Sequence, residues 1–138
     1  MNKETITIRN DISELEKIVQ KLEFIEEKWE LSPKIIFNLN LALEELISNI
    51  IFYGFDDDGE HEINISFEKE KTLLKILISD EGKEFNPFNV SVEEELDKSV
   101  EEREIGGLGI HFVKKLMDSF EYNRVNKINN ITLIKNIN

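Results

Sequence analysis

The sequence contains no cysteine, only two prolines, and few cationic side chains. The absence of cysteine excludes a disulfide framework, a thiolate nucleophile and a zinc site with cysteine ligands. Its 17 Lys and Arg residues stand against 29 Asp and Glu residues, which gives a formal net charge of −12. A nucleic-acid partner is therefore not expected, because phosphate contacts need clustered cations, and a basic or neutral protein partner suits this charge better.

Long hydrophobic runs are also missing. Nowhere do about 18 apolar residues follow one another, and the start, MNKETITIRN, lacks the apolar core of a signal peptide. We therefore expect no membrane segment and a cytoplasmic location, which the lack of cysteine also suits. Because 138 residues are the size of one ordinary domain, residues 1–138 are expected to form a single domain.

The spacing of apolar residues predicts an α+β fold. Alternation indicates strands, and recurrence at three and four residues indicates helices. The predicted strands cover residues 3–9, 61–68, 72–80, 120–125 and 130–137, and the predicted helices cover about 12–29, 33–53 and 108–119. This order predicts a two-layer α/β sandwich with a mixed, mostly antiparallel sheet and helices on one face. The long acidic segment between the second hairpin strand and the last helix has the length of a functional loop.

The second predicted helix carries two adjacent glutamates and an asparagine. At about 100° per residue, Glu44 lies opposite the apolar face, whereas Glu45 and Asn49 share a stripe that borders it. A half-buried carboxylate costs free energy unless it is paired or used. Taken alone, this pair also fits a solvated helix edge, and both interpretations stay open.

Two glycine-containing stretches have the same ambiguity. SDEGKEF places Asp80 and Gly82 in a tight turn at the end of a predicted strand, which alone is unremarkable. IGGLGIHF places Gly107 and Gly109 at the start of the last helix, where backbone N–H groups and the helix dipole favour a phosphate, although a sharp turn also explains them. Neither GxxxxGK[ST] nor the spaced dinucleotide fingerprint is present.

In this order and spacing, the three stretches resemble the N, G1 and G2 boxes of the GHKL ATPase superfamily, which has the Bergerat fold. The boxes read EELISNIIFYGF, DEGKEFNP and EEREIGGLGIHFVKKLMDSFEY, followed by a closing NNITLIKN. The chain is most similar to the bacterial anti-sigma regulatory factors, whose founding members are serine-protein kinases. This resemblance covers nearly the whole chain, and the three boxes together are far more specific than any one of them.

The resemblance implies that ATP and Mg²⁺ bind at the N box. Asn49 would hold the Mg²⁺ that bridges the ATP phosphates, since a single amide oxygen suits this cation. Glu45, one turn earlier, would be the general base for the serine hydroxyl of a partner protein. The two side chains would share a stripe because the base and the metal act at the same terminal phosphate.

The resemblance implies that the G1 and G2 boxes hold the adenine ring and the phosphates of ATP. Asp80 would accept a hydrogen bond from the adenine amino group, with Gly82 leaving room for the ring and Thr132 supporting that contact. The ATP lid would span residues 88–105. The backbone donors to the phosphates would be Gly107, Leu108 and Gly109.

The implied function is an ATP-dependent anti-sigma factor. It would sequester a sigma factor and phosphorylate a serine of a STAS-type anti-anti-sigma antagonist, as a monomer or as the homodimer that many relatives form. Two features depart from the family. Many relatives have a histidine after the N box, near Tyr53, and the acidic lid offers only Lys98 and Arg103 near phosphates. No role is assigned to Tyr53, and neither His61 nor His111 is expected to hold a metal.

Three alternatives remain. The acidic lid favours a nucleotide-responsive binding module without kinase activity, in which ATP only orders the lid for a partner. A histidine-kinase catalytic domain cut from its chain is disfavoured because no phosphoacceptor hairpin is present. The third alternative is a structural domain that no longer binds a ligand, which would require the three boxes to persist in the sequence without a function.

Overall fold

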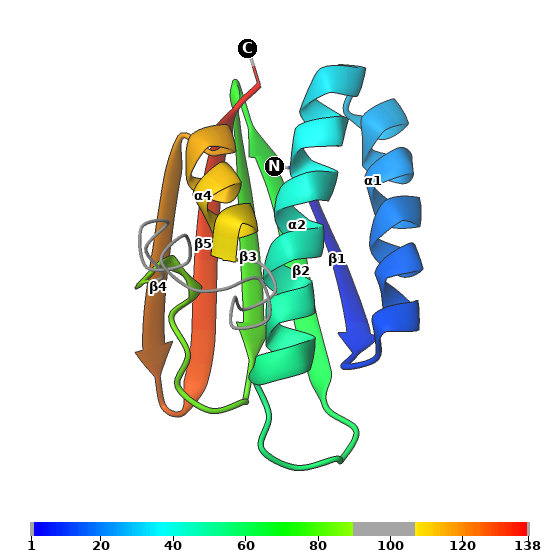
Figure 1. Ribbon diagram of the computed structural model, residues 1–138. Helices are drawn as coiled ribbons and strands as arrows, with labels where there is room; N and C mark the ends of the chain where they lie inside the picture. Colours follow the sequence, from blue (N-terminus) through cyan, green and yellow to red (C-terminus); the bar gives the residue numbers. More distant parts are fainter. Residues whose placement is uncertain (1, 90–106, 138) are drawn as a thin grey trace.

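The computed structural model describes residues 2–89 and 107–137. Within these residues, five strands form one sheet, and three α helices cover one of its faces (Figure 1). The α+β class and the two-layer arrangement with helices on one face are confirmed. Residues 90–105 of the expected lid lie outside the described part of the chain.

The elements follow the predicted order. Their bounds are β1 Asn2–Arg9, the 3₁₀ turn η1 Ile12–Glu14, α1 Leu15–Lys28, α2 Pro33–Tyr53, β2 Glu62–Glu70, β3 Leu73–Asp80, the 3₁₀ turn η2 Pro87–Asn89, α4 Gly107–Leu116, β4 Ser119–Val125 and β5 Ile128–Asn136. The strand order in the sheet is β1-β2-β3-β5-β4, and all four pairings among the described strands are antiparallel.

Local signals explain where α2 begins and ends. The Ser32 hydroxyl accepts a hydrogen bond from the backbone N–H of Ile35 at 3.2 Å, Pro33 occupies the first turn, and Gly54 follows the last residue. The first helix differs from the prediction, because Asp11 caps the short turn η1 and α1 begins only at Leu15.

The core lies between the sheet and α2. Alternate side chains of the central strands face the helices, and the apolar side of α2 packs on them. Fully buried members include Ile63, Ile65, Phe67, Leu74, Ile76, Ile78, Leu39, Leu43, Leu46 and Ile47. Among the described helices, α2 alone has the length and hydropathy of a membrane-spanning helix. One side of α2 is buried against the sheet, as in the core helix of a globular protein. This packing leaves Glu45 half-buried at the edge of the core.

Candidate functional site

The N and G2 boxes meet where α2 packs beside α4 (Figure 1). Glu44 is exposed, Glu45 is half-buried and Asn49 is 4% exposed, in agreement with the helical stripe read from the sequence. Gly109 on α4 lies directly against Glu45, because a Cβ added at Gly109 would overlap the Glu45 carboxylate and lie 2.8 Å from its Cγ. Only a glycine allows this approach of α4 to the carboxylate.

Burial sets the electrostatics of Glu45. Desolvation raises the pKa of its carboxyl, the charge of the neighbouring Glu44 raises it further, and a hydrogen bond with Asn49 acts in the opposite direction. The Asn49 amide therefore stabilises the ionised carboxylate. A carboxyl group with a raised pKa is a stronger base once ionised than an exposed one.

Asn49 has a second, unusual property. Its Oδ1 is buried and has no hydrogen-bond partner in the described part of the chain. Buried polar atoms are nearly always paired, so an exception points to strain or to a missing ligand. An unpaired amide oxygen beside a carboxylate is a site for a cation or for a hydrogen-bond donor.

The N-terminal turn of α4 adjoins the Glu45 carboxylate. The helix begins at Gly107, and Leu108 and Gly109 complete its first turn. The first backbone N–H groups of a helix have no partner within it, and the helix dipole makes this end positive. An anion bound there would lie next to Glu45, because Gly109 contacts that carboxylate.

The G1 turn packs against the C-terminal end of α2. Asp80 closes β3 and is 5% exposed, and its Oδ1 accepts a hydrogen bond from the backbone N–H of Gly82 at 2.8 Å. The backbone N–H of Lys83 donates to the carbonyl oxygen of Gly54 at 2.9 Å. A side chain at Gly82 would overlap that same carbonyl group. Asp80 and Asn49 are thus both held near the C-terminal half of α2.

The structure does not bring Thr132 to Asp80. Thr132 pairs with Leu77, and it alternates with the buried Ile131 and Leu133, so its side chain faces the side of the sheet away from the helices. Asn129 occupies the predicted place instead. It pairs with Asp80 in the ladder and donates from Nδ2 to Asp80 Oδ1 at 3.1 Å.

Sequence reasoning missed Asn129 and two side chains on the neighbouring strand. Arg124 and Tyr122 both donate to the Asn129 Oδ1, at 2.8 and 2.5 Å. The alternation of Ile131 and Leu133 already implied that residue 129 faces the helices. No sequence signal indicates Arg124 or Tyr122, since their contacts depend on the pairing of β4 with β5.

Comparison with known proteins identifies the family. A model of the histidine kinase-like ATPase domain matches residues 8–135. The chain belongs to this family, which confirms the resemblance seen in its three boxes.

Two curated relatives are named as serine kinases. The serine-protein kinase RsbW of Oceanobacillus iheyensis is 30% identical over 91 residues, which cover 64% of this chain and 58% of that protein. The serine/threonine-protein kinase BtrW of Bordetella bronchiseptica is 23% identical over 109 residues, which cover 79% of this chain and 75% of that protein. The match therefore spans little more than half of the first relative and three quarters of the second.

Solved structures share the fold. The RsbU and RsbW domains of a Mycobacterium tuberculosis protein align with a TM-score of 0.70 at 13% identity, covering 99% of this chain and 33% of that one. The histidine kinase domain of a blue-light activated kinase from Erythrobacter litoralis aligns with a TM-score of 0.56 at 12% identity, covering 91% of this chain and 60% of that one.

Proposed function

We propose that this chain is an ATP-dependent serine-protein kinase and anti-sigma factor, acting as a single cytoplasmic domain. It would sequester a sigma factor and phosphorylate a serine of a STAS-type antagonist. The observation that carries the proposal is the convergence of Glu45, Asn49 and Gly109, which sets a base, an unpaired amide oxygen and a helix N-terminus side by side. The kinase names of two relatives support the same activity.

The nucleotide would lie along the C-terminal half of α2. The Asp80 carboxylate would accept a hydrogen bond from the adenine amino group, and Gly82 would leave room for the ring. The phosphates would bind the backbone N–H groups of Gly107, Leu108 and Gly109, where the helix dipole favours negative charge.

The residues at the N box fit Mg²⁺. Asn49 Oδ1 is a neutral oxygen ligand, and it lacks a partner in the described structure. Magnesium prefers oxygen ligands and usually takes only one or two from the protein, with the rest from water and phosphates. When bound, Mg²⁺ would neutralise charge on the phosphate oxygens.

Glu45 would act on the substrate serine. Its ionised carboxylate takes the proton of the serine hydroxyl as the serine oxygen bonds to the γ-phosphorus. The bond from that phosphorus to the β–γ bridging oxygen breaks, and ADP leaves with the electron pair. The burial that raises the pKa of Glu45 strengthens it as a base for this transfer.

A nucleotide-responsive binding module is the second candidate. The sequence between residues 88 and 105 is strongly acidic, with only Lys98 and Arg103 as cations. Negative charge close to the phosphates opposes transfer more than it opposes the binding of a nucleotide through Asp80. In this reading, ATP changes only which partner the chain binds.

Labelling of purified STAS-domain proteins from the same genome with γ-labelled ATP separates the two functions. The parent chain and Lys34→Ala are expected to label one partner equally, since Lys34 is exposed in the first turn of α2, far along the helix from Glu45. Glu45→Ala is expected to lose about 100-fold in rate, the lower end for a general base, while its affinity for ADP is kept. ADP binding without any labelling would favour the binding module, and full labelling by Glu45→Ala would overturn the assigned base.

A further inference from the structure

Asn129 is a buried amide at the centre of a polar cluster on β5. It is 3% exposed, and its Nδ2 faces Asp80 Oδ1 at 3.1 Å, the carbonyl oxygen of Lys83 at 2.8 Å and that of Gly82 at 3.4 Å. An amide nitrogen has two hydrogens to give. Asn129 therefore ties the carboxylate of Asp80 to the backbone of the turn that follows it.

A contact with Arg124 on β4 shows which way the Asn129 amide is oriented. Arg124 Nη1 lies 2.8 Å from the Asn129 Oδ1 and also donates to the carbonyl oxygen of Gly82 at 3.0 Å. A guanidinium group only donates, so the atom of Asn129 that faces it must be the oxygen. The amide nitrogen is then turned towards Asp80.

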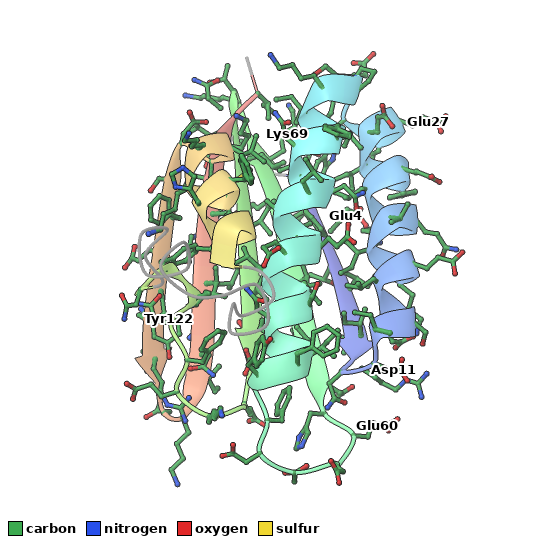
Figure 2. All side chains as sticks on the ribbon, in the orientation of Figure 1. Glu4, Asp11, Glu27, Glu60, Lys69 and Tyr122 are labelled. Carbon is green, nitrogen blue, oxygen red and sulfur yellow. The ribbon has the colours of Figure 1, made fainter. Side chains whose placement is uncertain are left out.

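Tyr122 gives the amide a second support. Its hydroxyl donates to the Asn129 Oδ1 at 2.5 Å and accepts from the backbone N–H of Phe85 at 3.3 Å. Tyr122 projects from β4, which lies at the edge of the described sheet opposite β1 (Figure 2). Residues 82–85 are thus bonded to both β4 and β5, through Asn129, Arg124 and Tyr122.

This cluster fixes which oxygen of Asp80 can meet a ligand. Within the described residues, both hydrogen bonds to the Asp80 carboxylate end on Oδ1, one from Gly82 and one from Asn129. Oδ1 is therefore fully engaged. The other oxygen, Oδ2, is left to accept a hydrogen bond from outside the protein.

We propose that Asn129 is a positioning residue that makes this site selective for 6-amino purines. It holds the Asp80 carboxylate so that Oδ2 faces the ligand. An amino group at the purine 6-position donates to that oxygen, whereas the 6-oxo group of guanine places a second acceptor against it. This inference rests on the proposed nucleotide binding, and it assigns to Asn129 the support that the sequence led us to expect from Thr132.

Calorimetric titration with ADP and with GDP, in the presence of Mg²⁺, tests the proposal. Asn129→Ala is expected to bind ADP about tenfold more weakly than the parent, or about 1.4 kcal/mol, with GDP affinity changed less than about twofold. The matched control is Asn130→Ala. Asn130 is the next residue on β5, but its side chain bonds Ser79 on the other face of the sheet, so both affinities are expected to stay unchanged.

The selectivity ratio distinguishes positioning from a structural role, because general destabilisation weakens both nucleotides alike. A folded Asn129→Ala with the parent's ADP-to-GDP ratio would overturn the proposal. If circular dichroism shows that Asn129→Ala is unfolded, the same titrations are made with Tyr122→Phe. It removes only a hydroxyl, and we expect about threefold weaker ADP binding with GDP unchanged; unchanged ADP binding would overturn the proposal. If the parent chain binds neither nucleotide, both the proposed function and this inference are wrong.

Discussion

Replacing Gly109 by alanine should separate folding from catalysis. In a helix, alanine is more stable than glycine by about 1 kcal/mol. The added Cβ would overlap the Glu45 carboxylate and lie 2.8 Å from its Cγ, far closer than real Cβ atoms approach. The atoms it meets belong to a flexible side chain, so Glu45 can rotate away at the cost of its hydrogen bond with Asn49, about 0.5–1.5 kcal/mol. The two terms nearly cancel, and the free energy of unfolding should change by less than about 1 kcal/mol.

The rotation of Glu45 should greatly lower the rate of phosphate transfer. Glu45 would leave its place beside Asn49, and displacing a general base, the role proposed for Glu45, costs about 100-fold or more in rate. Urea unfolding and initial rates of phosphate transfer to the partner serine measure the two effects on the same preparation. Lys115→Ala is the control on α4, since its side chain is exposed. A folded Gly109→Ala that transfers phosphate at the parent rate would refute the role of this contact.

Three further predictions concern the fold and its charges. Glu14 accepts hydrogen bonds from the backbone and side chain of Arg9 and from Lys17, which lower its pKa from 4.5 to about 2. Between these two pH values Glu14 is protonated in the unfolded chain but not in the folded one, so the free energy of unfolding should fall as the pH drops from about 4.5 to about 2. Over that range the urea midpoint should fall less steeply in Glu14→Gln than in the parent. Phe67→Ala should lower the free energy of unfolding by about 3–5 kcal/mol, measured in urea, because Phe67 is fully buried. Gly82→Ala should cost about 1–3 kcal/mol by thermal unfolding, since its Cβ would meet the Gly54 backbone, which cannot rotate away.

Local signals made much of the fold predictable. Ser32, Pro33 and Gly54 fix both ends of α2 through contacts within a few residues, so its bounds agree with the prediction. The stripe that joins Glu45 and Asn49 also follows from helix geometry alone, and the structure shows the expected difference in burial between Glu44 and Glu45. The 3₁₀ turn before α1 was missed because Asp11 caps it much as it would cap an α helix.

The proposed adenine side of the site was harder to predict because it depends on strand register. Side chains alternate along a strand, so a shift of three positions moves a residue to the other face. Thr132 and Asn129 differ by such a shift. The alternation with Ile131 and Leu133 places Asn129 on the face towards the helices, but only the pairing of β3 with β5 sets it beside Asp80. Arg124 reaches Gly82 across 42 positions of sequence, and this contact follows from the strand order rather than from any motif.

Calorimetric binding of ATP and ADP to the parent chain and to Asn49→Ala, with and without Mg²⁺, tests the central claim most directly. The account predicts that the parent binds both nucleotides and binds them more tightly with Mg²⁺, and that Asn49→Ala loses this dependence on the metal. Absence of binding to the parent at millimolar nucleotide, where a Kd of about 1 mM corresponds to about 4 kcal/mol, would contradict the account.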